Sequence, residues 1–187
     1  MSIENPGAIE GFFIDLTNNR LASPLYKKYV DSLHFKGDER LLDFGCGGGT
    51  LTGHVARKLE NGQVIGVDTS EYWIEKARKR LKGLHNVELK QGNIIDMDIN
   101  NFDVIFIHFV LHEIEGGGKQ RLATAKSLAE KLKPEGKIII REPTKASHGM
   151  SSSEITALMN KAGLREIRGE SQKSMFLGPM YFGIFEK

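Results

Sequence analysis

The chain has 187 residues, of which 40% are hydrophobic and 27% charged, as is typical of a globular domain with its own core. Its formal net charge of +2 argues against a dedicated nucleic-acid-binding protein. One cysteine excludes an intramolecular disulfide and a cysteine-cluster metal site, and no apolar run approaches the ~20 residues of a membrane span. Without a signal-peptide pattern at the start, we expect a cytoplasmic protein.

The first 35 residues precede the first predicted strand. They contain two segments, 8–16 and 23–33, whose apolar residues recur at the spacing of one helical face. We expect these segments to form helices that cover part of a sheet.

Residues 40–52 combine a short apolar strand, a glycine-rich turn and the start of a helix. The apolar run ends at Phe44, glycines occupy positions 45, 47, 48 and 49, and a helical pattern begins at Thr50. Glycine allows positive φ and lets a backbone lie directly against a ligand. We therefore expect a ligand-binding turn at this strand end.

Asp43 narrows the class of ligand. A carboxylate two residues before the first glycine would repel the pyrophosphate of a dinucleotide. Thr50 stands where a dinucleotide fingerprint starting at Gly45 needs a glycine, and no Gly-Lys-Ser/Thr follows to make a P-loop. The pattern favours a ligand that carries positive charge near the strand end.

From residue 39 onward, short strands rich in Ile, Val, Leu and Phe alternate with helical patterns, which predicts an α/β fold with parallel strands. We expect strands at 39–44, 63–68, 86–90, 102–108 and 136–141, and helices at 50–60, 70–82, 119–132 and 151–161. Ser70 and Ser151 are the predicted N-caps, Ser151 in a capping box with Glu154. Pro134 and Gly136 are predicted to end the helix at 119–132.

The end of the chain departs from this alternation. Two strand-like segments, 164–167 and 180–185, have no helix between them and are joined by a predicted loop with Gly178 and Pro179. Adjacent strands without a helical crossover pair antiparallel. We therefore expect an antiparallel strand at the end of the sheet.

A second acidic residue suggests a nucleoside. Asp68 ends the predicted strand 63–68, and its distance from Gly49 is the spacing at which a carboxylate meets ribose hydroxyls. Over residues 36–142 the chain resembles the class I S-adenosylmethionine-dependent methyltransferases, most of all the small-molecule enzymes related to quinone biosynthesis. The motifs that carry the resemblance, in order, are Asp43-x-Gly45-x-Gly47-x-Gly49, Asp68, Gly92-Asn93, 102–106 and 132–140.

The resemblance implies a Rossmann-like, seven-stranded, mostly parallel sheet with helices on both faces and an antiparallel C-terminal strand. It implies one methyltransferase domain over 1–187, with 1–35 as a helical cap and 36–187 as the catalytic core. The cap either covers a sheet edge or shapes the acceptor pocket through Phe12, Phe13 and Tyr26. The expected cofactor is S-adenosyl-L-methionine, and the expected partner is a small-molecule methyl acceptor.

The same resemblance assigns the cofactor site. Backbone at Gly45, Cys46 and Gly47 should pack against the methionine part, Asp43 should receive its ammonium, and Asp68 should accept from the ribose. Cys46 is otherwise a packing residue. Asn93 stands where the family has an acidic residue near adenine, a role that Asp96 could fill instead. The full predicted cofactor set is Asp43, Gly45, Cys46, Gly47, Gly49, Asp68, Thr69, Gly92, Asn93, Ile94 and His108.

His108 and His112 follow the strand at 102–108 and are the predicted catalytic residues. Ligands of open α/β sheets bind beyond the carboxyl ends of the strands, and histidine is suited to remove a proton near neutral pH. The alternative roles are a pocket-wall residue and a helix-start residue. The order is not His-Glu-x-x-His, and no metal site is predicted. Glu142 and His148 are secondary candidates for acceptor contacts.

Other functions stay open from the sequence: a methyltransferase acting on RNA or protein, a non-catalytic domain that binds the same nucleoside, and, more distantly, a nicotinamide enzyme. The oligomeric state is open between monomer and homodimer. A basic cluster on the predicted helix 70–82 is interpreted as a solvated face, with nucleic-acid contact as the alternative. Its members are Lys76, Arg78, Lys79, Arg80 and Lys82.

Overall fold

The computed structural model describes residues 23–145, 147–174 and 178–187. The chain divides into two compact units, Met1–Asn93 and Ile94–Lys187, each of which is described by itself below. The expected helix at 8–16, with Phe12 and Phe13, lies outside the described residues. Among the described residues, no helix is long and apolar enough to cross a membrane.

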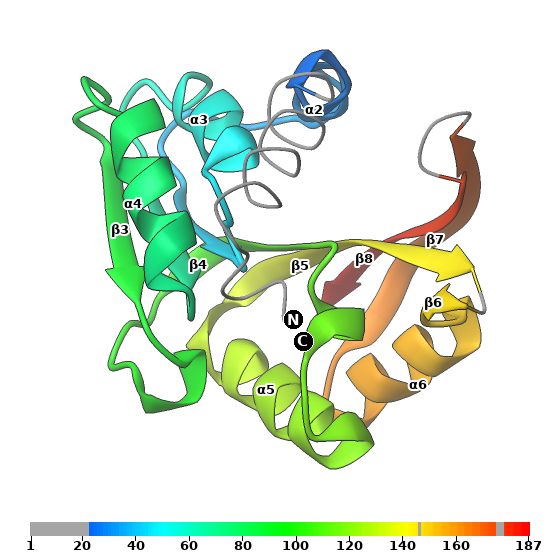
Figure 1. The fold of residues 1–187 in the computed structure, drawn as a ribbon. Helices are drawn as coiled ribbons and strands as arrows, with labels where there is room; N and C mark the ends of the chain where they lie inside the picture. Colours follow the sequence, from blue (N-terminus) through cyan, green and yellow to red (C-terminus); the bar gives the residue numbers. More distant parts are fainter. Residues whose placement is uncertain (1–22, 146, 175–177) are drawn as a thin grey trace. The chain divides into compact units, whose positions relative to one another are not determined.

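The first unit contains three parallel strands in the order β3-β2-β1. Aliphatic side chains such as Leu41, Leu42 and Ile65 are fully buried in it, as expected for parallel strands covered by helices. Helix α4 contacts β2 and β3, and α3 contacts β2 and α2 (Figure 1). The elements are α2 (Ser23–Asp31), β1 (Arg40–Phe44), α3 (Thr50–Ala56), β2 (Gln63–Asp68), α4 (Glu71–Arg80) and β3 (Val87–Gln91).

Helix α4 shows why these residues form a helix at this place. The Ser70 hydroxyl accepts a hydrogen bond from the Trp73 amide and so caps the N-terminus, as predicted. Trp73, Ile74 and Ala77 recur at helical spacing and are buried. The helix therefore turns one apolar face toward β2 and β3.

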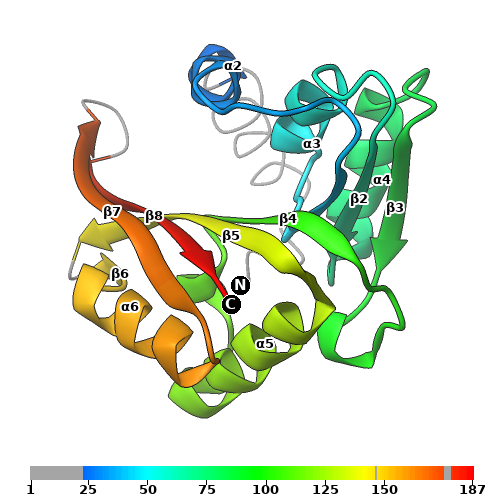
Figure 2. The same cartoon turned by 180° about the vertical axis from the view of Figure 1, so that it is seen from behind.

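The second unit contains a mixed sheet in the order β4-β5-β8-β7. Strand β5 is parallel to β4, whereas β8 is antiparallel to both β5 and β7, which confirms the predicted antiparallel ending. Helices α5 and α6 contact each other and lie side by side in both views (Figures 1 and 2). The elements are η2 (Ile94–Asp96), β4 (Phe102–His108), η3 (Leu111–Glu113), α5 (Gly117–Lys131), β5 (Leu132–Lys145), β6 (His148–Gly149), α6 (Ser152–Lys161), β7 (Arg165–Ser174) and β8 (Gly178–Glu186).

Three predicted boundaries in this unit are wrong. Strand β7 runs to Ser174, beyond the predicted segment 164–167. Strand β5 begins at Leu132, directly after α5, and not at residue 136. Residues 133–136 form an irregularity inside the strand, because Phe102 of β4 pairs with Leu132 whereas Val104 pairs with Lys137. Pro134 and Gly136 therefore mark a bulge and not a loop. Gly178 and Pro179 begin β8 instead of lying in a loop. A proline is tolerated near the start of a strand.

The N-terminus of α6 agrees with the sequence. The Ser151 hydroxyl accepts from the Glu154 amide, and the Glu154 carboxylate accepts from the Ser151 amide at 2.8 Å. The predicted capping box is therefore confirmed, because both orphan amides have local partners.

Gly49 gives a test of the packing between the glycine turn and α4. It has φ of 77°, and an added Cβ would lie 2.8 Å from Leu81 Cδ1, whereas at Gly83, with φ of 95°, an added Cβ would meet nothing within 4 Å. We expect Gly49→Ala to lower the free energy of unfolding by about 2–4 kcal/mol and Gly83→Ala by about 1–2 kcal/mol, because only the first adds a clash to the strain of positive φ. Urea denaturation measures both, and equal losses would mean that the contact with α4 is unimportant.

Candidate active site

In the first unit, the turns that follow β1 and β3 are both bonded to the last residue of β2. The Gly47 amide donates to Asp68 Oδ2 at 2.8 Å, and the Gly92 amide donates to the Asp68 carbonyl at 2.9 Å. The carboxyl ends of parallel strands lie at one edge of a sheet. The structure thus brings together the predicted glycine turn, Asp68 and Gly92-Asn93.

The Asp68 carboxylate accepts hydrogen bonds at both of its oxygens. Its Oδ1 accepts from the Ser70 amide at 2.9 Å, in addition to the bond from Gly47 to Oδ2. The side chain is partly exposed, and a carboxylate offers about four lone-pair positions. Thr69 beside it is exposed, and its carbonyl accepts from Gln91 at 3.4 Å.

Within the glycine turn, the four predicted residues differ in what they can offer a ligand. The amides of Gly45 and Cys46 both donate to the Val67 carbonyl, at 2.8 and 3.0 Å. Gly47 has φ of 49°, and an added Cβ there would meet nothing within 4 Å. Gly47 is therefore the position where the bare backbone lies open, while Gly45 and Cys46 fasten the turn to β2.

Cys46 is a packing residue of this turn. Its sulfur would lie 3.1 Å from a Cβ on Gly66, so β2 needs a glycine beneath it. Burial, and then the nearby charges of Asp43 and Asp68, raise the pKa of the thiol well above its usual value. A protonated, buried thiol is a poor nucleophile.

Asp43 lies beneath the turn with only 2% of its surface exposed. The Thr52 hydroxyl, in the first turns of α3, donates to its Oδ2 at 2.6 Å. Burial raises the pKa of Asp43 to about 6; hydrogen bonds from Thr52 lower it and the charge of Asp68 raises it. Thr52 could not be predicted as a partner of Asp43, because nothing in its spacing distinguishes it from an ordinary helix residue.

Arg80 is a second residue that sequence reasoning missed. Its guanidinium donates to the Gly48 carbonyl and, at 3.3 Å, to the Thr50 hydroxyl, so α4 holds the turn from outside. Arg78 is paired with Glu75 on the same helix. Two members of the basic cluster thus serve local contacts, which weakens the nucleic-acid interpretation of that cluster.

The predicted adenine residues differ in exposure. Asn93 and Asp96 are exposed and Ile94 is buried. Ile94 opens η2, and the buried Lys131 at the end of α5 donates to the Met97 carbonyl at 2.7 Å just beyond it. Lys131 thereby fixes the backbone that follows Ile94 within the second unit.

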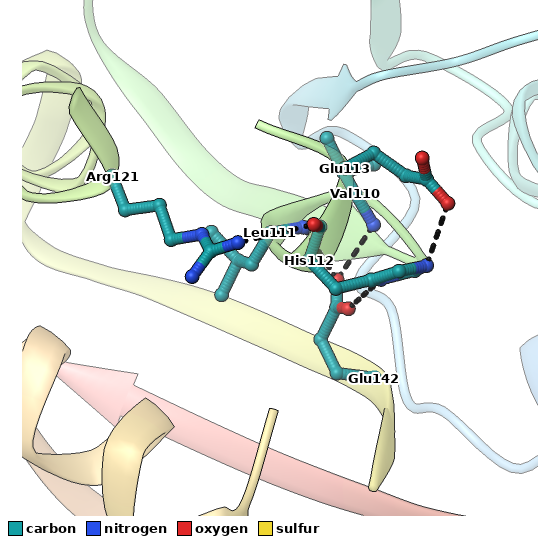
Figure 3. Close-up of polar contacts among 6 residues, drawn as sticks. All are labelled: Val110, Leu111, His112, Glu113, Arg121 and Glu142. Carbon is teal, nitrogen blue, oxygen red and sulfur yellow. Dashed lines mark hydrogen bonds and ion pairs between the residues drawn. The ribbon is translucent and has the colours of Figure 1, made fainter. Parts of the chain in front are cut away.

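In the second unit, Glu142 on β5 is the most buried carboxylate, with no exposed surface. Its Oε1 accepts from the amides of Val110 and Leu111 at 2.6 and 2.8 Å, and its Oε2 lies 2.6 Å from His112 Nδ1 (Figure 3). Buried charges persist in proteins when they are paired and hydrogen-bonded in this way. Glu142, a secondary candidate from the sequence, therefore organises the whole segment after β4.

His112 lies between two carboxylates. Its Nε2 is 2.9 Å from Glu113 Oε1, on the opposite side of the ring from Glu142. Burial lowers the pKa of His112, but the hydrogen bonds and charges of Glu142 and Glu113 outweigh it, so the pKa is raised. Arg121 on α5 donates to the His112 carbonyl at 3.1 Å and fixes its backbone (Figure 3).

His108 has the opposite character. It is buried at the end of β4, and burial, with the charge of Arg141, lowers its pKa well below the usual value. Its ring contacts that of Phe109 edge to face at 4.4 Å between centroids. Phe109 has φ of 60°, which is strained for a residue other than glycine. A neutral, buried His108 fits a pocket wall better than a titrating base.

A groove with a volume near 550 Å³ lies between α6 and β7. Glu166 in this groove accepts from Tyr181 at 2.8 Å and from Thr156 at 2.5 Å, which fastens α6 to the sheet. None of the predicted site residues lines it. The side chain of His148 is outside the described part, and among the described residues no group of three or more His, Cys, Asp or Glu is placed to hold a metal ion.

The sequence profile of a family described as "Methyltransferase domain" matches residues 35–175, so the chain belongs to that family, as the resemblance predicted. A demethylmenaquinone methyltransferase of Staphylococcus saprophyticus is 32% identical over 119 residues, which are 62% of this chain and 49% of that protein. A carboxy-S-adenosyl-L-methionine synthase of Colwellia psychrerythraea is 31% identical over 130 residues, or 64% of this chain and 52% of that one. The chain thus spans about half the length of these relatives.

Two solved structures share the fold. Mitomycin 7-O-methyltransferase MmcR has a TM-score of 0.81 at 19% identity, over 100% of this chain and 61% of that one. The N-methyltransferase NodS from Bradyrhizobium japonicum, solved with S-adenosyl-L-homocysteine, has a TM-score of 0.75 at 18% identity, over 91% and 89% of the two chains. The predicted Rossmann-like α/β fold class is confirmed.

The raised pKa of Asp43 predicts how its replacement changes stability with pH. The folded-state pKa of about 6 exceeds the unfolded value of 3.8, so the folded protein binds the extra proton and Asp43 costs stability as pH rises through 6. We compare the free energy of unfolding of Asp43→Asn with that of the original protein at the same pH. The variant's value minus the original's should be about 1–1.5 kcal/mol larger at pH 8 than at pH 5. Urea denaturation at the two pH values measures it, with the exposed Glu130→Gln as the control for loss of charge; a difference independent of pH would refute the assignment.

Proposed function

We propose that the protein is an S-adenosylmethionine-dependent methyltransferase that acts on a small-molecule acceptor. The observation that carries this proposal is the gathering of the glycine turn, Asp68 and Gly92-Asn93 around the last residue of β2. Membership of the methyltransferase domain family supports it. Two carboxylates and a bare backbone suit a cationic nucleoside better than an anionic dinucleotide.

The residues present fit this cofactor. The open backbone at Gly47 can lie against the methionine part, and the partly exposed carboxylate of Asp68 can accept from ribose hydroxyls. Asp43 is too buried to contact much of the cofactor, and it acts on the cofactor through its negative charge beneath the turn. Thr69, Asn93 and Ile94 are the proposed adenine contacts, and Gly45, Cys46 and Gly49 shape the turn.

When bound, S-adenosylmethionine supplies an electrophilic methyl group on a positively charged sulfur. The protein must then position the acceptor and remove its proton. We propose that Nε2 of His112 takes this proton from the acceptor, because Nδ1 is held by the buried Glu142 at 2.6 Å. This arrangement suits an acceptor with an O–H or N–H group, in agreement with the O- and N-methyltransferases that share the fold. His108, neutral and buried, is proposed to line the pocket.

A second candidate function is a domain that binds the nucleoside without catalysis. The observation in its favour is that both ring nitrogens of His112 already contact carboxylates. RNA and protein acceptors remain further alternatives. A protein that binds cofactor but transfers no label from methyl-labelled S-adenosylmethionine to any component of a metabolite, RNA or protein extract would favour the non-catalytic function.

Cofactor binding is tested first. S-adenosylmethionine and S-adenosylhomocysteine should both raise the melting temperature. Asp68→Ala should weaken binding ~10-fold or more, because hydrogen bonds to a charged group contribute about 1.5–3 kcal/mol. Asp68→Asn is the matched variant, since its amide oxygen can still accept from Gly47. Isothermal titration calorimetry measures both affinities; a response to NAD alone would overturn the choice of cofactor.

The base is tested separately from binding. We expect His112→Gln and Glu142→Gln to reduce turnover about 100-fold or more, the usual contribution of general-base catalysis, with unchanged cofactor affinity. Turnover is measured with labelled cofactor and the acceptor identified from the extract. Full activity of His112→Gln would remove this residue from the mechanism.

A further inference from the structure

The imidazole of His112 is held on both sides by carboxylates of very different exposure. Glu142 Oε2 is 2.6 Å from Nδ1 and Glu113 Oε1 is 2.9 Å from Nε2. The Glu142 side chain has no exposed surface, that of His112 has 7%, and that of Glu113 has 36% (Figure 3). One contact is therefore sealed in the interior, and the other opens to solvent.

The two contacts fix the protonation state of the ring. An ionised carboxylate can only accept hydrogen bonds, so each ring nitrogen must carry a proton to satisfy both. An imidazolium whose Nε2–H points at Glu113 cannot take a proton from an acceptor. The raised pKa of His112 agrees with this state.

Only the contact with Glu113 can open at low cost. Glu142 is fixed by the amides of Val110 and Leu111 as well as by Nδ1. Glu113 sits on the short turn η3, and its carboxylate can rotate into water. Arg121 on α5 donates to the His112 carbonyl.

We infer that Glu113 controls the base: its carboxylate competes with the methyl acceptor for Nε2 of His112 and keeps the ring unreactive until an acceptor displaces it. On displacement, the Nε2 proton leaves with the Glu113 carboxyl and passes to water. The neutral Nε2 then takes the proton of the acceptor, whose electron pair would form the bond to the methyl carbon as the bond from that carbon to the sulfonium sulfur breaks and its electron pair stays on the sulfur. This inference rests on the proposed function of the same site.

The contact is tested without any acceptor by NMR titration of protein with ¹³C-labelled histidine. The chain has six histidines, and the His112 signal is identified by its loss in His112→Gln. In Glu113→Gln the amide oxygen can still accept from Nε2 but the charge is gone. We expect the acid dissociation constant of His112 to rise about 3- to 10-fold, a modest shift because Glu113 is partly exposed.

Glu115→Gln is the control, because it removes the same charge from an exposed position two residues away. It should leave the His112 titration unchanged. An unshifted titration in Glu113→Gln, or an equal shift in Glu115→Gln, would overturn the inference, whether or not the protein transfers methyl groups.

The consequence for catalysis has its own measurement. In Glu113→Gln the acidic limb of the kcat/KM profile should move to lower pH, with unchanged cofactor KM and higher turnover below neutral pH. An inactive Glu113→Gln that shows the expected titration shift would overturn the competing role of Glu113. Absence of methyl transfer in the original protein would instead count against the proposed function, and the NMR result would still decide the contact.

Discussion

The candidate active site depends on a carboxylate at the end of a strand that accepts hydrogen bonds from the loops around it. In the first unit this carboxylate is Asp68, which bonds the amides of Gly47 and Ser70 and thereby joins the glycine turn to the start of α4. Its backbone carbonyl holds the turn at Gly92. Charge-assisted bonds of this kind are stronger than neutral ones, so the side chain and the carbonyl of one residue together align three loops.

The second unit uses the same device with Glu142. Its buried carboxylate bonds the amides of Val110 and Leu111 and orients His112, so the segment after β4 is built around a residue of β5. Each unit contains features that are costly to maintain: Asp43 is nearly buried in the first unit, and in the second Glu142 is fully buried and Phe109 has a strained backbone. Backbone strain and buried carboxylates of this kind are typical of functional sites.

Much of the architecture could be predicted from the sequence because local signals agreed with the tertiary fold. Ser70 and Ser151 cap helices as expected, and the strands of the first unit lie within a residue of their predicted limits. Prediction failed at β5, where Pro134 and Gly136 mark a bulge inside a strand. Hydrogen bonding to β4 on both sides of these residues keeps them within the strand despite the local turn signal. This pairing with a distant strand cannot be predicted from the local sequence.

The sequence by itself determined the class of protein, because the order Asp43, glycine turn, Asp68 and Gly92-Asn93 reflects what the backbone and charge of the site require. Only the tertiary structure decided which side chains act together. Thr52 beneath Asp43, Arg80 against the turn, and Glu142 beside His112 are separated from their partners by 9, 32 and 30 residues. Their geometry is set by packing of strands and helices, and no spacing rule along the chain encodes contacts over such distances.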